Sequence, residues 1–116
     1  MKLKHYTLKP YQLESKHLSQ IHNIIEKVVS EKKDEYWDNY TDYSVFDQTI
    51  ITIGIIDDEV KTFSSIYTRE FYGEYVYRLL NRWLMSDDIR EEGGSKSFKG
   101  EHRFFDMIHQ QIEFVK

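Results

Sequence analysis

The stretch from Tyr75 to Ser95, YVYRLLNRWLMSDDIREEGGS, is the most informative part of this 116-residue chain. Its apolar and aromatic residues up to Met85 predict a long strand that runs directly into a loop with two glycines. Such a pair lets backbone N–H groups point into one concave space, where an anion also gains from the positive end of a following helix. Arg90 adds a fixed charge and Lys96 a second one at the rim. The stretch therefore predicts a diphosphate site, although an ordinary turn with two glycines has the same pattern.

A strand and a helix are predicted at the N-terminus. Residues 3–8 alternate weakly between apolar and polar before Pro10 interrupts the pattern. Ser15 can cap a helix whose apolar residues recur on one face, namely Leu18, Ile21, Ile24, Ile25, Val28 and Val29. His17 then falls on the solvent side of this helix. Residues 31–47 lack a clean period and predict a short helix near 32–39 followed by a loop.

Three strands joined by short turns are predicted in the middle of the chain. Residues 49–56 are β-branched on both faces, which is typical of an interior strand. Residues 60–69 follow a turn at 57–59, and residues 75–85 follow a turn that contains Gly73. An amphipathic helix starting at Ser97 or Glu101 then closes the chain, with an apolar stripe at Phe98, Phe105, Ile108, Ile112 and Val115. These elements predict an α+β fold with a mainly antiparallel sheet of about four strands flanked by helices.

Composition limits the class of protein. A chain of 116 residues with 40% hydrophobic content predicts one domain over residues 1–116. The charged fraction is 31% and the net charge is -4, with both signs interspersed, so we expect no nucleic-acid partner. The absence of cysteine excludes disulfides and thiolate metal sites and is compatible with a reducing compartment. No signal-peptide pattern or run of ~20 apolar residues is present, which predicts a cytoplasmic protein with no membrane contact.

The order of these elements resembles the N-terminal two thirds of the GNAT family of acyl-CoA N-acyltransferases. The resemblance rests on the order of the elements. A first strand is followed by two helices, a three-stranded meander, the motif Arg90-x-x-Gly93-x-Ser95 and a closing helix. The string YRLLNRWLMSDDIREEGGSKSFKGEHRFF is also similar to acetyltransferase-like proteins of marine phages. This resemblance implies transfer of an acetyl group from acetyl-CoA to a primary amine of a small molecule or peptide, without a metal.

The resemblance also implies a set of cofactor-binding residues. In the family, backbone amides of this loop hold the coenzyme A pyrophosphate, and the preceding strand pairs with the pantetheine arm. Carried over to this chain, these positions are Leu84, Met85, Arg90, Gly93, Gly94, Ser95 and Lys96. Ser95 replaces the usual final Gly or Ala, and Gly100 shifts the predicted start of the closing helix.

The family pattern continues beyond the residues of this chain. A fifth strand of GNAT enzymes splays from the fourth and opens the cofactor slot, so the resemblance implies a domain truncated after the helix that follows the loop. The edge of residues 75–85 would then keep unpaired backbone groups, which predicts a homodimer through this strand.

Candidates for acceptor binding and catalysis lie on the same strands. Arg78 and Arg82, which share one face of the strand, can together with Arg69 clamp a carboxylate or phosphate, or instead pair with acidic residues of neighbouring helices. Asn81 falls on an otherwise apolar face, where its amide orients a substrate or bonds to backbone. Glu70 at a strand end is a weak candidate for a general base, so the catalytic residue is unknown. The resemblance implies an acceptor pocket lined by Tyr36, Trp37, Tyr40 and Tyr43, although core packing or anchoring of a loop also accounts for these aromatic residues.

The closing helix carries three residues of types that bind metals. His102, Asp106 and His109 share one face at spacings compatible with metal ligation. Helical surfaces produce such sets by chance, and no further ligand cluster accompanies them. We therefore predict no metal.

Overall fold

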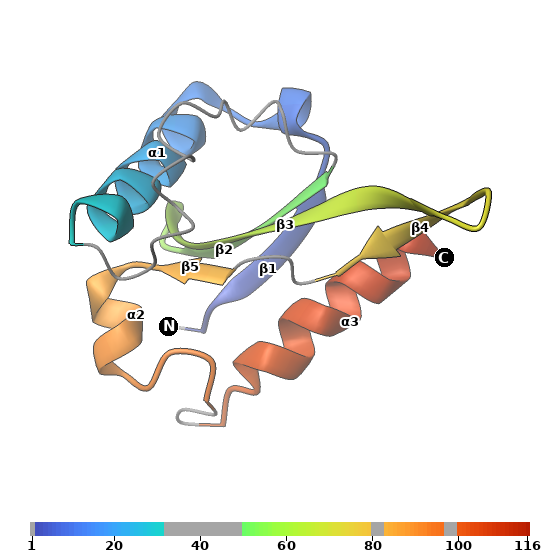
Figure 1. Ribbon diagram of the computed structural model, residues 1–116. Helices are drawn as coiled ribbons and strands as arrows, with labels where there is room; N and C mark the ends of the chain where they lie inside the picture. The colour runs from blue at the N-terminus through green and yellow to red at the C-terminus, as the bar shows by residue number, and fades with distance from the viewer. Residues whose placement is uncertain (1, 32–49, 80–82, 97–99) are drawn as a thin grey trace.

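The chain forms one antiparallel sheet with helices on both of its faces (Figure 1). The computed structural model describes residues 2–31, 50–79, 83–96 and 100–116, without the side chains of Val29, Tyr67 and Arg69. The α+β class and the antiparallel sheet agree with the prediction. The short helix predicted near 32–39 lies outside the described residues. In the described part, no helix is long and apolar enough to cross a membrane.

The sheet places its strands in the order β1-β2-β3, with β4 and β5 both paired to β3. The strands are β1 (Lys4–Leu8), β2 (Ile50–Ile56), β3 (Glu59–Phe71), β4 (Glu74–Arg78) and β5 (Trp83–Met85), and all pairs are antiparallel. The single strand predicted over 75–85 is therefore wrong in one respect. The pairing register with β3 shifts by two residues between β4 and β5, so two short strands take the place of one long strand.

Two tight turns connect the central strands where the sequence predicts them. Asp57 and Asp58 have φ angles of 52° and 63°, and Tyr72 and Gly73 have φ angles of 51° and 80°. Positive φ at both central residues is the geometry of type I′ turns, whose twist matches that of a hairpin. Aspartate tolerates this conformation better than most side chains, which explains the Asp-Asp turn.

Helix α1 (Ser15–Ser30), which follows a short 3₁₀ turn η1 (Pro10–Gln12), covers one face of the sheet. Its predicted stripe is confirmed: Ile21, Ile24, Ile25 and Val28 are buried in one core with residues of β2, β3 and β5. The opposing core residues are Ile51, Ile53, Val60, Phe63 and Leu84. Alternate residues of β2 point to the two faces of the sheet, so its other set faces away from α1.

Helix α3 (Arg103–Val115) packs on the other face, against β1 and β2, and follows the short helix α2 (Asp87–Glu91) (Figure 1). An amphipathic helix normally buries its apolar stripe. Here Phe105 is 66% and Ile112 is 37% exposed, whereas Arg103, Met107 and Gln111 are buried. The predicted apolar stripe is therefore only partly right: Phe105 and Ile112 face solvent, Ile108 and Val115 are half-buried, and Phe98 lies outside the described residues.

The reason is that the part of this face that lies against Gln111 is polar. Thr52 and Ser64 are buried opposite each other, and the Gln111 amide donates to both hydroxyls, at 3.2 and 3.4 Å. Thr7 shares a hydrogen bond of 2.9 Å with Thr52. A buried hydroxyl needs a partner, and an apolar side chain cannot supply one. The helix therefore turns its amide, and not Phe105, toward the strands.

Gly54 allows β2 and β3 to approach each other closely on this polar face. It pairs with Thr62, and a Cβ atom at position 54 would overlap the Thr62 hydroxyl and lie 3.1 Å from Leu3 Cδ1. We expect Gly54→Ala to lower the free energy of unfolding by about 1–3 kcal/mol, the usual cost of overpacking a core. Urea denaturation followed by circular dichroism measures this loss.

A matched rescue tests the proposed cause of that loss. Thr62 Oγ1 is buried without a hydrogen-bond partner among the described residues, so Thr62→Ala alone should change stability little. Gly54→Ala combined with Thr62→Ala should recover most of the loss. If the double variant is as unstable as Gly54→Ala, the clash with Thr62 is not the cause.

Candidate functional site

The loop with the two glycines closes the C-terminal end of α2. Gly93 and Gly94 have φ angles of 111° and 64°, which glycine adopts without strain. Their N–H groups donate to the carbonyls of Arg90 and Ile89 at 3.1 and 2.9 Å, and the Lys96 N–H donates to Gly93 at 3.2 Å. The structure thus uses these three amides within the chain. The sequence motif instead predicts amides directed at a ligand, at the start of the closing helix.

Arg90 also has partners within the chain. Its guanidinium pairs with Asp87 one turn earlier and lies 4.0 Å from a Glu31 oxygen. Lys27 of α1 pairs with the same Asp87. Hydrogen bonds from Lys27 and then from Arg90 hold the pKa of the Asp87 carboxyl below its usual value. In this structure the positive charge of Arg90 is therefore matched by carboxylates.

The loop is held in place from the α3 side by a buried ion-pair network. Arg103, which is only 2% exposed, donates to Glu101 at 2.8 Å, to Glu92 at 2.7 Å and to the Gly94 carbonyl at 3.3 Å. Glu101 is buried as well and accepts the Leu3 N–H at 3.1 Å. This network ties the loop, the start of α3 and the start of the chain together.

The two predicted residues of the strand before the loop face in different directions. Leu84 is a core residue packed under α1. Met85 lies near the loop, because a Cβ atom on Gly94 would be 3.3 Å from its sulfur. Met85 and Arg90 together line a cavity of about 200 Å³ beside α1. Of the seven predicted cofactor positions, these two therefore share one hollow.

The predicted acceptor residues are only partly described. Asn81 and Arg82 lie outside the described residues, as do Tyr36, Trp37, Tyr40 and Tyr43. For Arg69 only the backbone is described, and it pairs with Val76 in the β3–β4 hairpin. Glu70 is exposed in the same hairpin, opposite Tyr75.

The three residues with metal-ligand spacing on α3 do not converge. Within the described ranges there is no group of three or more His, Asp or Glu side chains that could hold a metal ion. Asp106 and His109 instead line a cavity of about 530 Å³ with His5 of β1. His5 is buried, and neither of its ring nitrogens has a partner in the described part of the chain.

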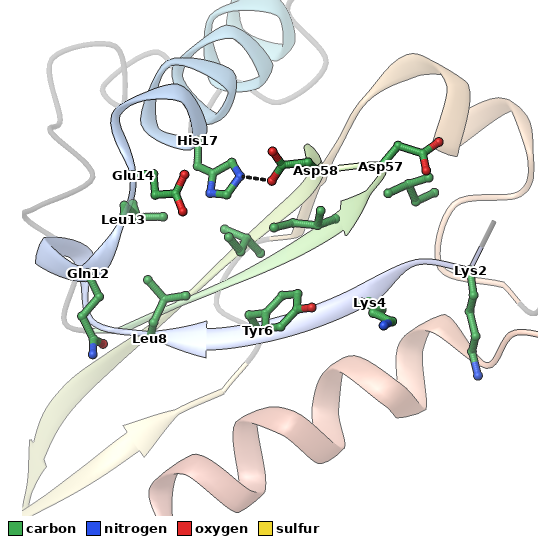
Figure 2. Close-up of a pocket in the computed structure, with 13 residues that line it drawn as sticks. Lys2, Lys4, Tyr6, Leu8, Gln12, Leu13, Glu14, His17, Asp57 and Asp58 are labelled. Carbon is green, nitrogen blue, oxygen red and sulfur yellow. Dashed lines mark hydrogen bonds and ion pairs between the residues drawn. The ribbon is translucent and has the colours of Figure 1, made fainter.

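A cavity of about 620 Å³ lies on the opposite face of β1, beside the start of α1 (Figure 2). It exists because α1 packs mainly over β3 and β5 and leaves the outer part of this face uncovered. Three kinds of groups surround it: lysines of the N-terminus and β1, mainly apolar residues of β1, β2 and Leu13, and polar residues of η1, α1, the segment between them and the β2–β3 turn. They are Lys2, Lys4, Tyr6, Leu8, Gln12, Leu13, Glu14, His17, Ile53, Ile55, Ile56, Asp57 and Asp58.

His17 and Asp58 form the polar wall of this cavity. His17 Nε2 lies 3.2 Å from Asp58 Oδ1 (Figure 2). Lys16 pairs with the other oxygen of Asp58. Hydrogen bonds from Lys16 and then His17 lower the pKa of the Asp58 carboxyl. The prediction that His17 faces solvent is wrong, since it is only 8% exposed. A signal was present, because His17 precedes Ile21 by four residues and so extends the buried stripe.

No family model matches this chain, and no curated protein and no solved structure gives a significant match to it.

Proposed function

We propose that this chain is a GNAT-like domain that binds acetyl-CoA beside β5 and transfers its acetyl group to a primary amine. The observation that supports the proposal is the arrangement of elements. An antiparallel sheet in the order β1-β2-β3-β4 lies between α1 and α3, and β5 leads through α2, which carries Arg90, into the loop with Gly93 and Gly94. The loop packs beside Met85, at the end of β5.

The proposed reaction is a direct transfer. The lone pair of the neutral amine attacks the thioester carbonyl carbon, the C–S bond breaks, and coenzyme A leaves as a thiolate. The proton lost by the amine ends on that thiolate, directly or through water. Glu70 is exposed on the β3–β4 hairpin and would reach this proton only if the acceptor lies there. The proposal therefore assigns no base.

Binding of the pyrophosphate requires the loop to change its hydrogen bonds. The amides of Gly93, Gly94 and Lys96 would exchange backbone carbonyls for phosphate oxygens, and Arg90 would exchange Asp87 for a phosphate. Both exchanges replace one hydrogen-bond partner with another, and phosphate is a favourable partner for backbone amides and for guanidinium. The proposal thus predicts a rearrangement of α2 and the loop on binding.

Calorimetric titration with coenzyme A tests the proposal. We expect micromolar binding that weakens at least tenfold in Arg90→Ala and in Gly93→Val, because the first removes a charge and the second puts a β-branched residue at a φ of 111°. Gly73→Val is the matched control, since Gly73 also has positive φ and a Cβ atom there would meet nothing within 4 Å. Loss of binding in Gly73→Val as well would point to general misfolding.

The loop amides and Arg90 already have hydrogen-bond and ion-pair partners within the chain. This favours a second candidate, a non-catalytic GNAT-like module that binds a partner or itself. Strand β4 supports self-association, because all five of its residues are exposed and it pairs only with β3 among the described strands. Such an open edge can pair with another chain. Absence of any heat with coenzyme A, together with a dimer mass in light scattering that is lost in Tyr77→Pro, would favour this candidate, because the N–H of Tyr77 faces the open edge of β4.

A further inference from the structure

Strand β4 presents an open backbone edge. The turn at 72–73 has two residues, so Phe71 and Glu74 close the hairpin as a hydrogen-bonded pair. Hydrogen-bonded pairs recur at every second position, and the residues between them, Tyr75 and Tyr77, direct their N–H and C=O groups away from β3. Among the described strands only β3 pairs with β4, and Figure 1 shows the hairpin projecting beyond the rest of the sheet. The outer edge of β4 can therefore accept one more strand.

The order of charges along β4 determines which strand fits this edge. Its sequence is EYVYR, with Glu74 at one end, Arg78 at the other and Val76 in the centre, and all of its residues are exposed. An antiparallel neighbour runs in the opposite direction, so a second copy of β4 centred on Val76 places Glu74 opposite Arg78 of the second copy. The same pair recurs on the other side of the centre, because twofold symmetry relates the two copies. Strand β4 is thus complementary in charge to itself.

The same register covers the aromatic residues of β4. Tyr75 and Tyr77 are 76% and 48% exposed, and both lie on the face opposite to that of Val76. In the pairing centred on Val76 each Tyr75 lies opposite a Tyr77, and the outward backbone groups of these residues then form the hydrogen bonds of the ladder. Cross-strand aromatic pairs and opposite charges both stabilise such a ladder. A register shifted by two residues would instead place Glu74 or Arg78 opposite valine, and both charge pairs would be lost.

We propose that two copies of this chain form a dimer by antiparallel pairing of their β4 strands, in the register that is centred on Val76 and selected by Glu74 and Arg78. This register is a property of the self-associating module given as the second candidate, so it rests on that function and not on binding of coenzyme A. The dimer has one continuous sheet across both copies, and its isologous interface pairs the open edge of each β4.

Charge reversal tests this register, with dimerisation measured by sedimentation velocity over a series of protein concentrations. Glu74→Arg gives a chain with a positive charge at both ends of β4, and Arg78→Glu gives a chain with a negative charge at both ends. Each variant alone should dimerise about tenfold or more weakly than wild type, because two attractive pairs become two repulsive pairs. An equimolar mixture of the two variants should dimerise within about threefold of wild type, because every positive residue then lies opposite a negative one.

The mixture is also the folding control, because two misfolded variants would not recover dimerisation. Glu26→Arg, which makes the same change in net charge as Glu74→Arg at an exposed position of α1, should keep wild-type dimerisation. The proposal is overturned if wild type stays monomeric at every concentration, if either charge variant alone dimerises as tightly as wild type, or if the mixture is as weak as its components. Dimerisation that is lost in Tyr77→Pro but kept in both charge variants would leave the second candidate function standing and would exclude this register.

Discussion

Arg103→Met should lower the free energy of unfolding by about 3–5 kcal/mol, the usual cost of removing one member of a buried ion pair. Arg103 is 2% exposed and donates to Glu101, Glu92 and the Gly94 carbonyl. Without the guanidinium, Glu101 would keep a negative charge away from water. Domains of this size have a total stability of about 5–15 kcal/mol, so we expect urea denaturation to show a large loss of the folded fraction.

A rescue variant separates the loss of charge pairing from the loss of packing. Glu101→Gln added to Arg103→Met removes the uncompensated charge, while the amide oxygen can still accept the Leu3 N–H. We expect the double variant to recover at least half of the lost stability. Lys116→Met is the surface control, because its pair with Glu113 has both side chains about two-thirds exposed, and its effect should stay within about 0.5 kcal/mol.

An Arg103→Met variant as stable as wild type would mean that the network contributes nothing. If Glu101→Gln gives no recovery, the loss comes from packing of the arginine side chain. Either result would also remove the reason to regard Arg103 as the residue that positions the Gly93-Gly94 loop.

Local periodicity predicted the elements of the chain well where one face of the sheet is apolar. The stripe of α1 is buried as expected, because β2 presents Ile51 and Ile53 to it. The same reasoning was only partly right for α3, where the opposing strands present Thr52 and Ser64 and the helix buries Gln111 in place of Phe105. Spacing within a helix shows that two faces differ, but the partner surface decides which face is buried.

The loop illustrates a second limit of prediction from sequence. Its two glycines indicated a loop at Gly93 and Gly94, and both residues adopt positive φ there. The direction of their N–H groups depends on where α2 ends, and no residue pattern predicted this five-residue helix. The two glycines determine which backbone conformations the loop can adopt. Whether its N–H groups donate to a carbonyl or to a phosphate depends on the residues packed around the loop.

The cavity at β1 was not predicted, because it forms from residues far apart in the chain. His17 meets Asp58 across 41 positions, and their contact depends on the position of α1 over the sheet. Short-range sequence patterns predict the strand, the helix and the Asp-Asp turn one by one. Only the packing of the three creates the hollow between them.

The stability of this protein should depend on pH through His5. Burial lowers the pKa of His5 to about 4 from its usual value of 6.5, although Asp106 and Glu101 act in the opposite direction and Arg103 adds slightly to the decrease. Neither ring nitrogen has a hydrogen-bond partner among the described residues, and the ring lies 6.3 Å from that of Trp83, measured between centroids. The folded state therefore favours the neutral imidazole.

The sign of the effect follows from proton linkage. Between pH 6.5 and about pH 4 the unfolded chain binds a proton at His5 that the folded chain does not bind. The stability that the folded protein gains by keeping the His5 ring neutral is fully present above pH 6.5 and is lost as the pH falls toward 4. A shift of this size corresponds to about 3 kcal/mol.

His5→Met isolates this contribution from the carboxyl groups that titrate in the same range. We expect the stability of wild type to fall about 3 kcal/mol more than that of His5→Met between pH 7 and pH 4, as measured by urea denaturation at each pH. His22→Asn, at an exposed position of α1, should keep the wild-type pH profile. Parallel profiles for wild type and His5→Met would show that the folded protein protonates His5 as readily as the unfolded chain, and the imidazole would then have access to water or to a partner.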